Sequence, residues 1–177
     1  VAVSEPFIVN EQPPLISGIR NYPACEQNGV ILFGDDMALG GGLVQADTLA
    51  GQLSALIGAP VINAGVAGDT TETALARLEQ DVISQNPKVV VIFLGSNDLI
   101  NGLSRIDAAN NLKQIAERIT NSGASLLLLG VEGEGLGDSL TLDYKIISES
   151  SGAGYFPNIL RGIVGNEMFT LDLVHPN

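Results

Sequence analysis

Short apolar runs alternate along this chain with longer segments in which apolar residues recur at helical spacing. A continuous apolar run of about four to eight residues is typical of a buried strand, whereas apolar residues spaced about three or four apart are typical of an amphipathic helix. The predicted strands are residues 30–33, 61–62, 88–94 and 125–131, and the predicted helices are residues 48–57, 71–83, 107–121 and 142–150. A last short extended piece is predicted over residues 169–171.

The alternation of strands and helices predicts the fold class. Parallel neighbouring strands need long crossover connections, and helices of this length supply them. We therefore expect a doubly wound, flavodoxin-like α/β fold, in which a parallel sheet is flanked by helices on both faces in three layers. Residues 1–28 read as an irregular arm because prolines interrupt every candidate element, and residues 29–177 form the predicted domain.

Composition and charge exclude several classes of partner. The 177 residues, of which 45% are hydrophobic and 16% are charged, fit one globular domain. Eight basic and twenty acidic residues give a net charge of −12, which repels phosphate backbones and anionic lipids. We expect no nucleic-acid partner. The longest apolar run, residues 89–94, is too short to cross a bilayer.

The cysteine content and the first residue bear on the compartment. Cys25 is the single cysteine, so neither an intramolecular disulfide nor a cysteine-rich metal site is expected. The sequence begins at Val1 without a methionine, which suggests a processed or trimmed product and is compatible with a periplasmic or secreted protein. The compartment and the oligomeric state stay open.

Polar residues follow the predicted strands, where a parallel sheet binds its ligands. Four segments stand out: Gly34-Asp35-Asp36, residues 65–69, Gly95-Ser96-Asn97-Asp98, and residues 172–175. Taken singly, Gly-Asp and Asn-Asp pairs are most often turns or helix caps, and a lone His near a terminus is often only solvated. Their joint occurrence at strand ends favours a functional site.

The order of these segments resembles the SGNH/GDSL hydrolase family of esterases, lysophospholipases and thioesterases, over residues 30–177. In that family Gly-Asp-Ser supplies the nucleophile, a later Gly and the Asn of Gly-x-Asn-Asp form the oxyanion hole, and Asp-x-x-His supplies the base with its orienting carboxylate. The resemblance implies that Gly68 and Asn97 are oxyanion donors, that His175 is the general base and that Asp172 orients it. It implies no cofactor and no metal, and a small or lipid-like acyl ester as substrate.

Asp36 stands where the family has its nucleophilic Ser. Attack by a carboxylate on an ester would give a mixed anhydride instead of an acyl ester, and a carboxylate beside His175 would raise the pKa of the imidazole and occupy the base. The oxyanion hole would also face a like charge. We therefore expect weak or absent acyl transfer from this chain. It would be an altered version of an active hydrolase, a non-catalytic ligand-binding relative, or an enzyme with changed chemistry.

Two other uses of the acidic and hydroxyl residues are open. The first is a hard divalent cation bound by carboxylates, or a reaction with Asp36 as nucleophile; the carboxylates are those of Asp35, Asp36, Asp98 and Asp172. The second is Ser139 as a substitute nucleophile in Gly137-Asp138-Ser139-Leu140, although no apolar strand immediately precedes that segment and helix capping is its simpler role.

Members of that family usually continue past the His-Pro pair, here His175 and Pro176, into a helix that covers the sheet, whereas this sequence stops at Asn177. The resemblance therefore implies either a missing C-terminal segment or a site with less cover than usual.

Overall fold

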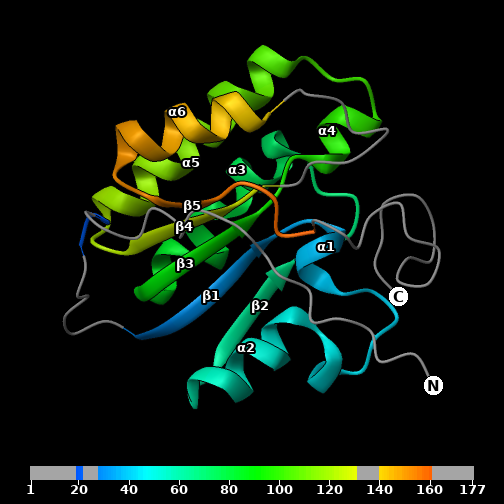
Figure 1. Cartoon of the computed structure of the whole chain (residues 1–177), viewed down its shortest axis with the longest axis vertical. Coiled ribbons are helices and arrows are strands. Elements are labelled where there is room, and N and C mark those ends of the chain that lie inside the picture. The colour runs from blue at the N-terminus through cyan, green and yellow to red at the C-terminus, as the bar shows by residue number, and fades with distance from the viewer. Residues whose placement is uncertain (1–18, 22–27, 131–139, 161–177) are drawn as a thin grey trace, which may run out of the picture.

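A twisted parallel sheet forms the centre of the molecule (Figure 1). The computed structural model describes residues 19–21, 28–130 and 140–160. Within these residues five parallel strands form one sheet in the order β2-β1-β3-β4-β5. The strands are β1 (Asn28–Gly34), β2 (Val61–Gly65), β3 (Pro87–Phe93), β4 (Ser125–Leu129) and β5 (Gly154–Phe156). This order is that of flavodoxin-like sheets, and the predicted doubly wound α/β fold is confirmed.

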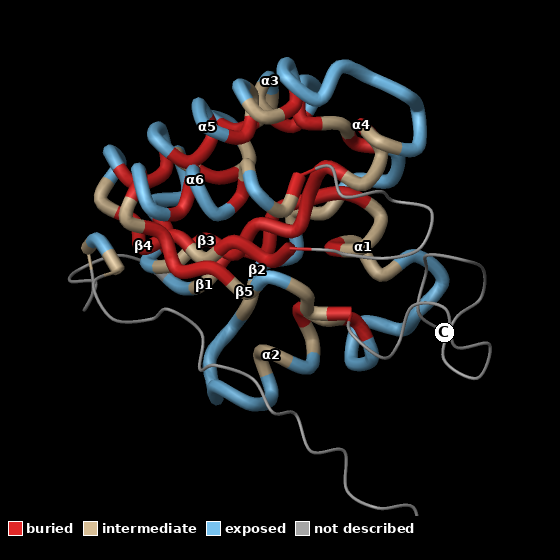
Figure 2. Tube along the Cα trace, turned by 45° about the horizontal axis from the view of Figure 1, so that its top comes forward, coloured by how far each residue is buried: buried red, intermediate tan, exposed pale blue. Residues whose placement is uncertain are grey.

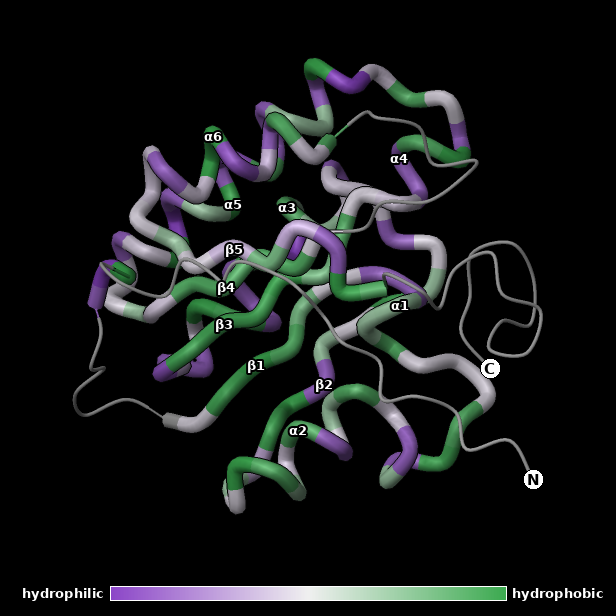
Figure 3. The backbone as a smooth tube through the Cα atoms, viewed as in Figure 1, coloured by the Kyte–Doolittle hydropathy of each residue, from purple (hydrophilic) through white to green (hydrophobic). Residues whose placement is uncertain are grey.

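Strands β1, β3 and β4 are hydrophobic along most of their length because both faces of the sheet are covered there (Figure 3). Successive side chains of a strand point to opposite faces, so one apolar run supplies two cores. In β1, Ile31 and Phe33 belong to one buried cluster and Leu32 to the other. In β3, Val90 and Ile92 face the first cluster, and Val91 faces the second.

Helices pack on both faces of the sheet (Figure 2). The described helices are α1 (Asp36–Leu39), α2 (Leu49–Ile57), α3 (Thr71–Asp81), α4 (Ser96–Ile100), α5 (Arg105–Asn121) and α6 (Thr141–Ser151), with short 3-10 helices η1 (Gln45–Asp47) and η2 (Ile83–Gln85). Side chains of α3, α5 and α6 complete the first core, and those of α1 and α2 contribute to the second. No helix in the described ranges has both the length and the apolar run needed to span a bilayer.

The long elements lie close to their predicted positions, and the short ones were not foreseen. The strand predicted at residues 61–62 continues to Gly65, so β2 is three residues longer than predicted. The helix predicted over residues 71–83 ends at Asp81, and Ile83 begins η2. Helices α1 and α4 and strand β5 were missed because they span only a few residues each. Residues 131–138 and 169–171, and nearly all of the predicted arm, lie outside the described residues.

Gly34 ends β1 at a point where the neighbouring strand approaches closely. It pairs with Gly65 of β2 and Phe93 of β3. A Cβ at Gly34 would lie 1.8 Å from the carbonyl oxygen of Phe93. We expect Gly34→Ala to lower the free energy of unfolding by about 1–3 kcal/mol, since the backbone must move to admit a methyl group. Urea denaturation measures this, with Gly41→Ala as control because a Cβ there meets nothing within 4 Å. Equal stability of the two variants would contradict the close approach.

Candidate active site

Three polar segments meet at the carboxyl ends of β1, β2 and β3 because these strands end in register. Gly34, Gly65 and Phe93 lie side by side in the sheet. Just beyond them, the Val66 N–H donates to the carbonyl of Gly34 at 2.9 Å, and the Asp35 N–H donates to that of Phe93 at 3.2 Å. The loops after β1 and β2 are thereby each tied to the end of a neighbouring strand.

The carboxylate of Asp36 lies at the centre of this edge. Its Oδ2 accepts a hydrogen bond from the Gly68 N–H at 2.8 Å and another from Nδ2 of Asn97 at 2.9 Å. Donors at about 2.7–3.1 Å from a shared point are the geometry that stabilises an oxyanion. The structure thus brings together three of the five predicted site residues, and a carboxylate oxygen of the chain itself stands where negative charge would be stabilised.

The backbone fixes both donors. Gly68 has φ +74°, a left-handed conformation that glycine adopts without steric cost. It lies in a turn closed by a hydrogen bond from the Asp69 N–H to the Val66 carbonyl at 3.2 Å. Asn97 lies in the first turn of α4, and its Nδ2 also donates to the Asp69 carbonyl at 3.0 Å. The amide of Asn97 therefore links the β2 loop to Asp36.

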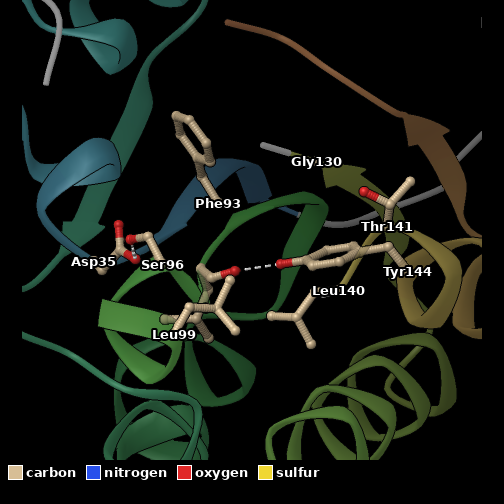
Figure 4. A pocket seen from close by; sticks show the side chains of 10 residues that line it. Asp35, Phe93, Ser96, Leu99, Gly130, Leu140, Thr141 and Tyr144 are labelled. Carbon is tan, nitrogen blue, oxygen red and sulfur yellow. Dashed lines mark hydrogen bonds between the residues drawn. The ribbon is translucent and has the colours of Figure 1, made fainter. Parts of the chain in front are cut away.

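Asp35, one residue before Asp36, is buried beside a cavity (Figure 4). Its Oδ2 accepts from Oγ of Ser96 at 2.6 Å, and its Oδ1 accepts from the Met37 N–H at 3.0 Å. Leu140 and Tyr144 line the opposite side of the cavity. Burial raises the pKa of Asp35 from 3.8 to about 6, although the hydrogen bond from Ser96 lowers it.

The raised pKa of Asp35 predicts a specific loss of stability as the pH rises. The folded chain holds this proton more tightly than the unfolded chain, whose carboxyl titrates near 3.8. The contribution to stability is therefore complete below about pH 4 and is lost as the pH rises through about 6, by about 3 kcal/mol in all. We expect the free energy of unfolding of the unmodified chain, minus that of Asp35→Asn, to fall by most of this amount between pH 4 and pH 7. A difference that stays flat in urea titrations would contradict the assignment.

Asp98 is buried, and both of its carboxylate oxygens accept hydrogen bonds within the protein. Its Oδ2 accepts from the Thr71 N–H at 2.9 Å and its Oδ1 from the Thr71 hydroxyl at 2.6 Å. Asn111 of α5 also donates to the Thr71 hydroxyl, at 3.2 Å. These bonds anchor α4 to the start of α3. Among the described residues no group of three or more His, Cys, Asp or Glu side chains is arranged to hold a metal ion.

Arg77 of α3 contacts the candidate site but was not predicted from the sequence. Its Nε donates to Oδ2 of Asp69 at 2.7 Å, and one of its terminal nitrogens donates to the Gly34 carbonyl at 3.1 Å. Its guanidinium also lies 4.3 Å from the centre of the Phe33 ring. Arg77 and Asp81 are four residues apart on one helix, so the sequence alone could have indicated their local ion pair. The contacts with Asp69 and Gly34 depend on the fold and had no sequence signal.

The remaining predicted residues lie outside the described residues. These are Asp172 and His175, assigned as orienting carboxylate and general base, and Ser139, considered as a substitute nucleophile. The catalytic roles of Asp36, Gly68 and Asn97 also stay predictions, because proximity does not establish chemistry.

Comparisons with known proteins agree with this arrangement. Residues 32–136 match the model of the GDSL-like Lipase/Acylhydrolase family. Esterase TesA of Pseudomonas aeruginosa is 31% identical over 122 residues, which are 66% of this chain and 61% of that protein. Thioesterase 1/protease 1/lysophospholipase L1 of Escherichia coli K12 is 24% identical over 123 residues, which are 66% of this chain and 59% of that protein.

A solved structure extends the likeness beyond the segment matched in sequence. AlinE4, an SGNH-hydrolase family esterase, superposes with a TM-score of 0.75 at 30% identity, over 86% of this chain and 88% of that one. The match to the family model covers more than half of the 177 residues, and it includes the segments that carry Asp36, Gly68 and Asn97. The chain therefore belongs to the GDSL-like lipase/acylhydrolase family.

Proposed function

We propose that this chain carries the site of an SGNH/GDSL-type ester hydrolase for small or lipid-like acyl esters, with Asp36 in the nucleophile position and acyl transfer consequently weak or absent. One observation carries the proposal: the Gly68 N–H and the Asn97 amide converge on a single oxygen at residue 36. An oxyanion hole requires two donors directed at one point. Two turns that served only the fold would have no such requirement.

With a Ser at position 36, the site would perform acyl transfer in the way the family does. The hydroxyl attacks the ester carbonyl carbon while His175 takes its proton, and the charge that develops on the carbonyl oxygen is stabilised by Gly68 and Asn97. His175 then returns the proton to the leaving alcohol, and water releases the acyl group in a second round. Asp172 holds the imidazole of His175 in the correct orientation. The roles of these last two residues rest on the spacing of Asp172 and His175 and on the family.

With Asp36 in place, a carboxylate oxygen of the chain itself occupies the proposed oxyanion hole. A substrate carbonyl must displace a carboxylate oxygen that accepts two hydrogen bonds. Hydrogen bonds to a charged group contribute about 1.5–3 kcal/mol each, so a neutral ester oxygen competes poorly. The charge of Asp36 would also oppose the developing oxyanion. Loss of the nucleophile and occupation of the hole therefore act in the same direction.

The test is an assay of short-chain aryl esters with the unmodified chain and with Asp36→Ser, with substantial turnover expected only from the variant. If the Asp36→Ser variant is folded yet inert, the proposal fails and the site is that of a non-catalytic ligand-binding relative. If the unmodified chain turns over esters and loses that activity on chelation or on Asp36→Asn, a metal or an Asp nucleophile is responsible instead.

A further inference from the structure

We propose that Arg77 is a positioning residue that sets the distance between the Gly68 N–H and residue 36. The inference rests on the proposed function, in which Gly68 is an oxyanion donor. Arg77 is on the buried side of α3, where its side chain is 17% exposed. Its side chain contacts both Gly34, in the segment before residue 36, and Asp69, the residue after Gly68.

On one side Arg77 holds Asp69, the neighbour of Gly68. Its Nε and a terminal nitrogen both approach Oδ2 of Asp69, at 2.7 Å and 2.6 Å. Asp69 is 4% exposed, so its charge needs a partner inside the protein. The other oxygen, Oδ1, accepts from the Thr73 hydroxyl at 2.5 Å. The side chain of Asp69 is thus fixed from α3, and the peptide that joins it to Gly68 is fixed with it.

On the other side Arg77 holds the end of β1. Its terminal nitrogen donates to the Gly34 carbonyl at 3.1 Å, the same oxygen that accepts from the Val66 N–H. Its guanidinium lies against the ring of Phe33, the residue before Gly34. Asp36 follows Gly34 by two residues. One planar cation therefore joins the two segments whose separation determines the 2.8 Å bond from Gly68 to Asp36.

The shape of the guanidinium explains why this position holds Arg. A third nitrogen donates to Asp81 at 3.0 Å, so the group makes directed bonds to Asp69, Gly34 and Asp81 at once. A Lys ammonium is a compact charge on a flexible stem and does not reproduce the planar fork. We therefore expect Arg77→Lys to keep the charge that Asp69 needs while loosening the alignment of Gly68.

The first arm of the experiment measures the alignment without any turnover. In the chain with Asp36 intact, hydrogen exchange of the Gly68 amide is measured by NMR for Arg77→Lys and for Arg118→Lys. Arg118 of α5 is a matched control, because it pairs on an exposed surface, at 3.0 Å, with Glu79 of α3, the helix that carries Arg77. We expect exchange at Gly68 to rise at least about tenfold in Arg77→Lys, with amides of β3 and β4 unchanged, and no change in Arg118→Lys.

The second arm measures catalysis in the Asp36→Ser background. There we expect Arg77→Lys to lower kcat by about 10-fold to 100-fold with KM within about twofold, and Arg118→Lys to change neither. A residue that served only the stability of the fold would lower the melting temperature without this separation of kcat from KM. If Asp36→Ser is inert, the proposed function fails, yet the exchange measurement still decides whether Arg77 positions Gly68.

Unchanged exchange at Gly68 in a folded Arg77→Lys variant would overturn the inference, and so would exchange that rises equally throughout the sheet. If Arg77→Lys does not fold, Asp81→Asn replaces it, because Asp81 is 31% exposed and accepts a hydrogen bond from Arg77 at 3.0 Å. A smaller rise in exchange confined to Gly68 and its turn supports the inference, and an unaltered Gly68 in that variant overturns it.

Discussion

The Asp36→Ser variant is expected to hydrolyse short-chain aryl esters at least about a thousandfold faster than the unmodified chain. The change supplies a nucleophile whose acyl ester is open to water, and it removes the carboxylate that accepts from Gly68 and Asn97. Ser is also smaller than Asp, so it fits the first turn of α1 without displacing its neighbours. The measurement is kcat/KM for both proteins at the same pH.

Two controls at position 36 distinguish the effect of adding a nucleophile from the effect of removing the carboxylate from the oxyanion hole. Asp36→Ala removes the carboxylate without supplying a nucleophile, so it should gain no turnover. Asp36→Asn keeps the shape of Asp36 but removes its charge, and it should stay inactive as well. Comparable turnover by the Ala and Ser variants would contradict the assignment of residue 36 to the nucleophile position.

Substitutions in the Asp36→Ser background test the proposed roles of His175 and Ser139. His175→Ala should return the rate to that of the unmodified chain, since the hydroxyl then lacks its base. Ser139→Ala should leave the rate unchanged. Activity that survives His175→Ala but disappears with Ser139→Ala would indicate that Ser139 is the nucleophile.

The central strands β1, β3 and β4 could be predicted from sequence because they are apolar runs buried on both faces of the sheet. Residues 88–94 needed no knowledge of their neighbours to be assigned, and the structure has β3 within one residue of that range. Strand β5 spans three residues, too few for a periodic pattern, and exists because its backbone pairs with β4. Helix α1 likewise depends on a cap, the hydrogen bond from the Met37 N–H to the Asp35 side chain.

Part of the candidate site could likewise be predicted from the sequence, and part could not. That Asp36, Gly68 and Asn97 meet at one edge follows from the rule that parallel strands end together. That Oδ2 of Asp36 itself lies between the two donors depends on a side-chain conformation and on distances of 2.8 Å and 2.9 Å, which a sequence does not specify. The bond from Ser96 to Asp35 joins residues 61 positions apart, and only the finished fold brings such pairs together.

In the Asp36→Ser background, Asn97→Ala is expected to lower kcat by about 100-fold to 1,000-fold, the usual cost of losing one oxyanion donor. Charge on the carbonyl oxygen develops only as the nucleophile attacks, so the amide of Asn97 stabilises the transition state more than the bound ester. The value of kcat/KM should therefore fall by nearly the same factor as kcat, with little change in KM. Steady-state kinetics with one aryl ester measures both.

Asn110→Ala is the matched control for Asn97→Ala, because Asn110 is an exposed residue of α5 and removing its amide should leave kcat within about twofold. Asn97 has a second task, the 3.0 Å bond to the Asp69 carbonyl, so part of the loss would come from a displaced Gly68. Adding Arg77→Lys to Asn97→Ala distinguishes the two contributions. If Asn97 acts by direct donation, the double variant loses further activity through Gly68; if it acts only by holding the turn, the second change adds almost nothing.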